Sequence, residues 1–424
     1  MKIKTKKKSY AEVMALPREK HKRPLRQLAV VRKFLNLVST VAMIPIPFTY
    51  EKIGMEKLGK KEPCLVLMNH SCFMDLEIAA RLLSDRAYHV VCTLDGFVGK
   101  KFLLRLLGCI STKKFINDVT LVRDMRFAVR ELKASVLMYP EASYSFDGTA
   151  TPLPDSLGKC IKLLNVPVVV IQTEGLFLRT PLYNCLKNRK AKISAKMEYL
   201  LSVEEIQSMS ASQINEVVRS RFAFDHFKKQ QEEKILIKEK YRADGLHRVL
   251  YKCYQCQEEG HMLGKGTHIT CQKCGQTHEL TEDGFLREST GNTLMPHIPD
   301  WYRWERESVR QELLDETYLL DIDVIIYMMV DTKCVYQVGE GRLTHNLEGF
   351  HLTGCDGQLD FWQKPKASYG LYADYYWYEI GDMICVGDEQ VQYYCFPKNQ
   401  ENVVAKARLA TEELFKLVTC KAVE

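Results

Sequence analysis

Short apolar runs alternate with amphipathic stretches along residues 62–200. Apolar runs with the length of buried strands occupy 64–68, 88–94, 135–140 and 166–173. Stretches with apolar positions at helical spacing occupy 73–83, 119–134 and 156–164. Strands that alternate with helices usually build a parallel sheet with helices packed on it. The pattern therefore predicts an α/β domain with a mixed, largely parallel sheet.

The pattern changes in the second half of the chain. A charged stretch at 224–245 predicts a helical connector, and a compact cysteine-rich module follows it. From residue 319 the apolar positions alternate with period two, which predicts about seven short strands. Helical spacing returns at 402–418. An all-β region with one C-terminal helix resembles a pleckstrin-homology-like barrel.

A chain of 424 residues is too long for one ordinary hydrophobic core, so several domains are expected. The predicted units are a basic arm with an interfacial membrane anchor, the α/β domain, the helical connector, a zinc ribbon, an aromatic and helical linker, and the β-rich domain. Their boundaries are 1–49, 50–223, 224–246, 247–283, 284–318 and 319–424.

The formal net charge of +7 is concentrated in the N-terminal arm. Residues 1–33 contain twelve Lys and Arg against only Glu12 and Glu19. Such an arm binds either phospholipid headgroups or nucleic acid. Residues 34–48 are apolar but contain Pro45 and Pro47, and they are shorter than the ~20 residues that span a bilayer.

This order of basic and apolar residues favours an interfacial anchor on an anionic phospholipid surface and disfavours nucleic acid. The alternative is a buried core helix behind a solvated basic tail. The sequence shows no secretory signal, and its odd total of fifteen cysteines suits reduced thiols. We therefore expect a peripheral or monotopic protein on the cytoplasmic face of the cell membrane.

The cysteine-rich module has the spacing of a metal site. Cys253 and Cys256 form one Cys-x-x-Cys pair, and Cys271 and Cys274 form a second pair fourteen residues later. Four thiolates complete a tetrahedral Zn²⁺ site, so the spacing predicts a structural zinc ion in a fold that resembles a zinc ribbon. Four free thiols are the alternative. Zinc ribbons occur in nucleic-acid-binding proteins and as braces between domains, so the module does not define a function.

His70 and Asp75 lie where a predicted strand ends and a helix begins. A side chain at the carboxyl end of a parallel strand faces the crevice where α/β proteins bind ligands. Histidine accepts a proton near neutral pH, and a carboxylate five residues later can orient the ring. An Asp in the first turn of a helix is also common because it faces the positive end of the helix dipole. The pair alone is therefore a weak signal of catalysis.

Three further segments accompany this pair: Gly108 to Lys114, Tyr139 to Ser145, and Val166 to Val169. Together the four segments resemble the conserved blocks of the glycerolipid acyltransferase family, which includes the 1-acylglycerol-3-phosphate acyltransferases. The resemblance covers roughly residues 25–225. The whole chain resembles multidomain bacterial members of this family, notably from Firmicutes, with a zinc ribbon and a β-rich C-terminal domain.

The resemblance implies direct acyl transfer from acyl-CoA or acyl-carrier protein to the free hydroxyl of 1-acyl-sn-glycerol-3-phosphate, which gives phosphatidic acid in phospholipid synthesis. It implies that His70 is the general base and Asp75 its orienting carboxylate. The substrate-binding residues that it implies are Lys113, Lys114, Glu141, Ser143 and Tyr144. Glu141 either positions the acceptor glycerol or braces the site, and an ordinary solvated carboxylate is the alternative for it.

Two departures from the family pattern affect the acceptor site. Lys114 stands where Arg is usual in the second block, and Tyr144 stands where the third block has Arg. A guanidinium binds phosphate through two parallel hydrogen bonds, whereas Tyr offers one neutral donor. The acceptor can therefore be another lysophospholipid or glycerolipid. A non-catalytic lipid- or nucleic-acid-binding protein with a degraded site is the competing hypothesis.

Overall fold

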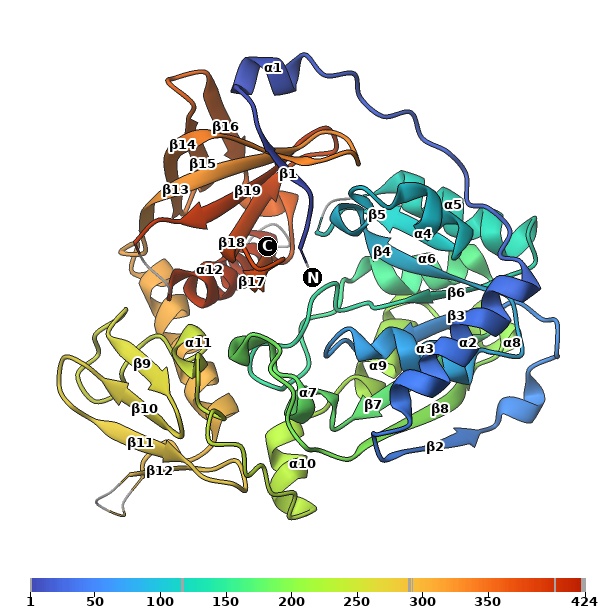
Figure 1. Cartoon of the computed structure of the whole chain (residues 1–424), viewed down its shortest axis with the longest axis horizontal. Helices are drawn as coiled ribbons and strands as arrows, with labels where there is room; N and C mark the ends of the chain where they lie inside the picture. Colours follow the sequence, from blue (N-terminus) through green and yellow to red (C-terminus); the bar gives the residue numbers. More distant parts are fainter. Residues whose placement is uncertain (1, 116–117, 289–290, 292, 400–401, 421–424) are drawn as a thin grey trace.

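The structure is a computed structural model that describes residues 2–115, 118–288, 291, 293–399 and 402–420. Figure 1 shows an α/β domain beside a β-rich C-terminal domain, with a small four-stranded sheet below the latter. The N-terminal segment runs from the β-rich domain across to the α/β domain, so the beginning of the chain contacts both.

A seven-stranded sheet with the order β2-β8-β7-β3-β6-β4-β5 forms the centre of the α/β domain. Strands β7, β3, β6, β4 and β5 are parallel, β8 is antiparallel to β7, and β2 is parallel to β8. The sheet is therefore mixed and largely parallel. The strands are β2 (Phe48–Ile53), β3 (Leu65–Met68), β4 (Tyr88–Thr93), β5 (Cys109–Thr112), β6 (Ser135–Met138), β7 (Val168–Glu174) and β8 (Ile193–Leu201).

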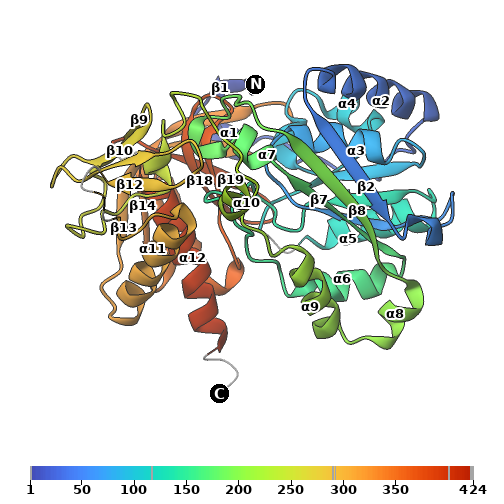
Figure 2. The ribbon, with the colours of Figure 1, turned by 90° about the horizontal axis from the view of Figure 1, so that it is seen from below.

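Helices cover both faces of this sheet, as Figure 2 shows. The side chains of β3 alternate between the two faces: Val66 and Met68 pack towards α2 and α3, and Leu65 and Leu67 pack towards α5, α6 and α9. The helices and 3₁₀ turns are α2 (Ala29–Met43), η1 (Met55–Lys57), α3 (Met74–Leu82), η2 (Leu94–Phe97), α4 (Lys101–Leu106), α5 (Val119–Arg130), α6 (Ser156–Leu164), α7 (Leu176–Arg179), η3 (Leu182–Asn184), α8 (Val203–Ser208) and α9 (Ala211–Arg221).

The predicted connector at 224–245 is helical only in α10 (His226–Glu232). The chain turns at Lys234, which has a φ of 54°, and residues 235–239 form neither helix nor strand. Ile237 is buried there, and its N–H donates to the Glu282 carbonyl at 2.7 Å. The charged sequence predicted a helical connector, but the helix ends at Glu232, and tertiary packing buries the apolar side chain of Ile237 beyond it.

The N-terminal arm is bound to both large domains. Its first strand, β1 (Thr5–Lys7), pairs parallel with β14 of the β-rich domain and precedes α1 (Tyr10–Met14). Glu19 pairs with Lys101 at 2.5 Å and accepts a hydrogen bond from the Thr332 hydroxyl at 2.7 Å. In the described part of the chain, no helix combines the length and the apolar character needed to cross a bilayer.

The cysteine-rich module forms a four-stranded antiparallel sheet with the order β12-β11-β10-β9. It reaches Glu288, five residues beyond the predicted boundary. Trp301 of the following helix is buried and donates its indole N–H to the Lys252 carbonyl at 2.9 Å, which attaches the helix to the module. The elements are η4 (Leu246–Arg248), β9 (Met262–Lys265), β10 (His268–Cys271), β11 (Thr277–Leu280), β12 (Leu286–Glu288) and α11 (Ile298–Leu314).

The C-terminal domain has seven strands and one terminal helix, where about seven strands and a helix were predicted, and the pairing of these strands is antiparallel. Its strand order is β16-β15-β14-β13-β19-β18-β17, and α12 packs on β17, β18 and α11. No pairing in the described residues joins β16 to β17, so the closed pleckstrin-homology-like barrel is not confirmed. The elements are β13 (Leu320–Met329), β14 (Val335–Asn346), β15 (Gly349–Gly354), β16 (Leu359–Gln363), η5 (Pro365–Ala367), β17 (Tyr372–Trp377), β18 (Gly381–Gly387), β19 (Gln392–Pro397) and α12 (Val403–Cys420).

The β-rich domain docks beside the carboxyl ends of β4 and β5. Asp95, which directly follows β4 in η2, is buried and accepts hydrogen bonds from the Tyr372 hydroxyl at 2.6 Å and from the Trp377 indole N–H at 3.2 Å. Phe115, which follows β5, packs edge-on against the Tyr369 ring with centroids 5.3 Å apart. These contacts place β17 opposite the edge of the sheet where His70 lies.

Candidate active site

His70 and Asp75 form a hydrogen-bonded pair at the carboxyl end of β3. The Nδ1 atom of His70 lies 2.9 Å from Oδ2 of Asp75. The same oxygen accepts the backbone N–H groups of Ser71 at 2.8 Å and Cys72 at 3.1 Å, and Asp75 is fully buried. An ionised carboxylate only accepts hydrogen bonds, so Nδ1 carries the proton and Nε2 is left to accept one.

Two tyrosine rings pack against the His70 imidazole. Tyr139 stacks on it with ring centroids 3.9 Å apart, and Tyr144 packs against it at 4.3 Å. Burial lowers the pKa of His70 below its ordinary value, and the hydrogen bond that the ring donates to Asp75 acts in the opposite direction. The ring is therefore neutral at pH 7 and able to take up a proton.

Glu141 braces the loop that carries His70. One carboxylate oxygen accepts the backbone N–H of His70 at 3.0 Å, and the other accepts the backbone N–H of Thr151 at 3.0 Å. Burial raises the pKa of Glu141 to about 7, and these hydrogen bonds oppose that shift. The next residue, Ala142, has a φ of 57°, in the left-handed region that favours glycine.

A pocket of about 2280 Å³ contains the His70 ring and extends between the α/β domain and the β-rich domain. Of the predicted substrate-binding residues, Lys113, Lys114 and Tyr144 line this pocket. Glu141 and Ser143 are buried behind it and do not line it. The structure therefore brings together the predicted base and the predicted cations, and it gives Glu141 a supporting position.

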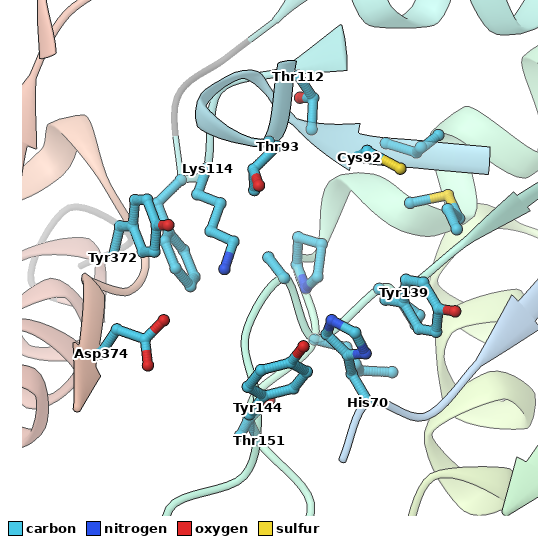
Figure 3. Close-up of a pocket in the computed structure, with 18 of the residues that line it drawn as sticks. His70, Cys92, Thr93, Thr112, Lys114, Tyr139, Tyr144, Thr151, Tyr372 and Asp374 are labelled. Atoms are coloured by element: carbon cyan, nitrogen blue, oxygen red, sulfur yellow. The ribbon is translucent and has the colours of Figure 1, made fainter. Parts of the chain in front are cut away.

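Side chains of β17 face the predicted site across the pocket (Figure 3). The ammonium group of Lys114 lies 4.2 Å from the centre of the Tyr372 ring, and Asp374 is close to it on the same strand. Burial lowers the pKa of Lys114 and raises that of Asp374 to about 7. Sequence reasoning missed Tyr372 and Asp374, because an alternating strand pattern does not indicate which distant loop the strand faces.

Part of the pocket lining, here called the apolar limb, consists of apolar side chains of the α/β domain. It is lined by side chains from the helices on one face of the sheet and from β4, among them Leu35, Val38, Leu76, Val90, Leu104 and Leu107. An extended hydrocarbon chain gains free energy in such surroundings in proportion to the apolar area that it buries. The pocket thus combines an apolar limb, a histidine base and cationic side chains.

The four predicted zinc ligands lie together in the small sheet, and none of them lines the pocket. Their sulfur atoms are all within 4.8 Å of one another. The Cys253–Cys274 and Cys256–Cys271 sulfur distances are 3.8 and 3.7 Å. A tetrahedral site with Zn–S bonds of about 2.3 Å has sulfur atoms about 3.8 Å apart. The four cysteines therefore fit a tetrahedral metal ion.

No protein-family model matches the chain, and none of the curated protein sequences matches it either. Among solved structures the chain is similar to the 1-acyl-sn-glycerophosphate (LPA) acyltransferase PlsC from Thermotoga maritima. The identity is 18%, the match covers 45% of this chain and 78% of that chain, and the TM-score is 0.34. At this level of similarity the function has to be inferred from the geometry of the site.

The pKa of His70 is open to direct measurement by NMR titration of its imidazole. We expect a pKa below the ordinary value of about 6.5 because burial disfavours the charged ring. Asp75→Asn should lower it further, since Asp75 favours the protonated form. The exposed carboxylate of Asp85 gives the control, Asp85→Asn, which should leave the His70 titration unchanged. A rise in pKa in the Asp75 variant would contradict this electrostatic account.

Proposed function

We propose that this protein is a glycerolipid O-acyltransferase in which His70 is the general base. The reaction that we propose first is transfer of an acyl chain from acyl-CoA or acyl-carrier protein to the free hydroxyl of 1-acyl-sn-glycerol-3-phosphate. The product is phosphatidic acid for phospholipid synthesis. The observation that carries the proposal is the His70–Asp75 pair, at 2.9 Å, inside a pocket with an apolar limb and cationic side chains.

In this reaction Nε2 of His70 takes the proton of the acceptor hydroxyl as the oxygen attacks the thioester carbonyl carbon. The new C–O bond forms, the C–S bond breaks, and the proton on His70 passes to the leaving thiolate. Asp75 holds the ring in the tautomer that keeps Nε2 unprotonated and stabilises the imidazolium that forms. Lys113 and Lys114 bind the phosphate of the acceptor in this proposal.

The environment of Cys72 supports direct transfer without a covalent enzyme intermediate. Cys72 is the nearest thiol along the chain to His70, and it is 2% exposed. Burial raises its pKa to about 12, so the thiolate that a covalent mechanism needs is not populated near neutral pH.

His70→Ala should lower the rate of acyl transfer by about 10²–10⁴-fold, the usual contribution of a general base. The assay follows transfer from acyl-CoA and acyl-carrier protein to a panel of lysolipids by mass spectrometry. Cys72→Ala is the matched control and should retain activity, because its thiol takes no part in direct transfer. A folded His70→Ala protein with near wild-type activity would remove His70 as the base.

We also propose that the protein binds the anionic cytoplasmic surface of the membrane through α2. Apolar side chains on the outer face of this helix are exposed, among them Val30, Phe34, Leu37, Val38 and Val41. The short helix α4 exposes Phe102 and Leu103, and both helices line the apolar limb of the pocket. Apolar side chains beside basic residues suit an interfacial helix, and acyl chains would enter the pocket from this side.

The membrane proposal predicts that charges on α2 weaken binding to vesicles that contain phosphatidylglycerol. Phe34→Glu with Leu37→Glu should reduce binding at least about 10-fold, since each side chain contributes on the order of 1.5–3 kcal/mol when buried in an apolar phase. Leu314→Glu with Leu319→Glu, at exposed positions outside α2, is the control. Equal vesicle binding by the two double variants, or preferential binding to DNA, would contradict the proposal.

We infer further that the metal held by the four cysteines is a structural Zn²⁺. Four cysteine ligands complete the tetrahedron and leave no open position for a substrate. The small sheet has few buried apolar residues of its own, so the metal would supply much of its folding free energy.

The purified protein should therefore contain one zinc per chain by elemental mass spectrometry. Cys253→Ser with Cys271→Ser should remove the zinc and lower the temperature of thermal unfolding. Cys109→Ser, which changes a half-buried thiol outside the cluster, should leave the zinc content unchanged. Full zinc content in the double variant would refute this ligand set.

A further inference from the structure

The helix α12 carries a buried arginine, Arg408, into the pocket that contains His70. Its side chain is 4% exposed, and its guanidinium lies over the Phe146 ring at 4.2 Å. Nη1 donates to the Tyr144 carbonyl at 3.4 Å, and Nε donates to Glu412 at 3.1 Å. Arg408 belongs to the C-terminal domain, 338 positions beyond His70 in the sequence, yet it contacts the segment that packs on the base.

The Arg408 guanidinium still has a donor group available to a ligand. Among the hydrogen bonds of the described residues, Nε and Nη1 are used and Nη2 makes none. The aromatic ring of Phe146 and the Tyr144 carbonyl hold the side chain in one orientation. Because the guanidinium is planar and fixed in this way, little conformational entropy is lost when it binds an anion.

The charged cluster around Arg408 has an excess of positive charge. Glu412 pairs with Arg408 at 3.1 Å and with Arg306 at 2.7 Å. Glu413 pairs with Arg306 at 2.9 Å and with Lys416 at 2.6 Å. Three cations therefore share two carboxylates, and all three cationic side chains line the pocket. Asp147 and Glu141 also interact electrostatically with Arg306 and Arg408, but burial raises the pKa of both carboxyl groups, so they offset the positive charge incompletely. The cluster therefore favours an anionic ligand.

In the α/β domain, the residues closest to His70 provide few cationic donors. Tyr144 offers a neutral hydroxyl, and Lys114 is a single point charge that faces Asp374. A phosphate monoester carries close to two negative charges at pH 7 and is bound best by a guanidinium fork together with a second cation. Lys114 and Arg408 line the same pocket, and they are close enough for the charge of Arg408 to contribute to the lowered pKa of Lys114. One phosphate group can therefore face both cations.

We propose that Arg408 of the C-terminal domain joins Lys114 of the α/β domain, one of the two lysines assigned to the acceptor phosphate above, in binding that phosphate. This inference rests on the proposed acyltransferase function and specifies its acceptor as a lysolipid with an anionic phosphate head group. The β-rich domain thereby completes the acceptor site and determines its head-group specificity.

The test compares two acceptors that differ only in the phosphate: 1-acyl-sn-glycerol-3-phosphate and the matching 1-acylglycerol. Arg408→Gln should raise KM for the phosphorylated acceptor by roughly 10- to 100-fold, as expected for loss of a charge-assisted hydrogen bond. Transfer to 1-acylglycerol, which has no phosphate to bind, should change much less, so the effect should be selective for the phosphorylated acceptor. A merely structural role for Arg408 would affect both acceptors alike.

Lys406→Gln is the matched control on the same helix. Lys406 pairs with Glu259 at 2.7 Å and with Glu312 at 2.9 Å, and it does not line the pocket. If Arg408→Gln fails to fold, as judged by circular dichroism, Arg408→Lys takes its place. This variant retains the charge but loses the fork, so it should weaken only the phosphorylated acceptor, to a smaller extent.

The outcomes separate the two proposals. Absence of transfer by the wild-type protein to every lysolipid overturns the proposed function itself. Transfer by the wild type without any preference for the phosphorylated acceptor overturns the role of Arg408. An unchanged KM for the phosphorylated acceptor in the folded Arg408 variant does so as well, while a selective rise in that KM, absent from Lys406→Gln, supports it.

Discussion

Asp95 is buried between the α/β domain and the β-rich domain, where it accepts hydrogen bonds from Tyr372 and Trp377. Burial of a carboxylate without hydrogen-bond partners would cost several kcal/mol of folding free energy. The three side chains therefore hold the two domains together. The contact fixes β17 opposite His70, so that β17 forms one wall of the pocket. Without this docking, the carboxyl edge of the parallel sheet would face solvent and Lys114 would lose the Tyr372 ring.

The N-terminal arm strengthens the same arrangement. It begins as a strand on β14, passes Thr332 and Lys101, and ends in α2 on the α/β domain. Some of its basic side chains are also committed to contacts within the protein, since Arg23 lies over the Phe127 ring and Arg32 donates to the Ser84 carbonyl. Removal of residues 1–49 would disturb the docking of the domains as well as any membrane contact, which is why substitutions on the outer face of α2 are the sharper probe.

The sequence predicted the features that depend on local pattern. Buried parallel strands are nearly continuous apolar runs, so 64–68 and 166–173 were recognised with boundaries close to β3 and β7. The two Cys-x-x-Cys pairs are local as well, and their sulfur atoms do converge. The His70–Asp75 contact was predictable because both residues lie within one strand-to-helix turn.

Features that depend on contacts between distant segments were not predictable. The charged sequence at 224–245 did not reveal that Ile237 would be buried beyond the end of the helix. The pairing of β1 with β14 joins residues more than 300 positions apart, and the sequence of neither strand indicates which strand it pairs with. For the same reason the contributions of Asp374 and Arg408 to the pocket have no sequence signature.

The charge of the shared pocket follows from burial of its acidic groups. Burial raises the pKa of Asp374 to about 7, so near neutral pH this carboxyl is only partly ionised and compensates the Lys114 ammonium incompletely. Glu141, with a pKa also raised to about 7, is likewise incompletely ionised behind the pocket. Arg408 stays charged throughout this range, and its pKa is raised further by Glu412. The pocket thus becomes more positive as the pH falls through 7, while His70, whose pKa is lowered by burial, takes up a proton only at a lower pH than an ordinary histidine. A positive pocket and an unprotonated base coexist because the same burial acts in opposite directions on carboxyl groups and on imidazole.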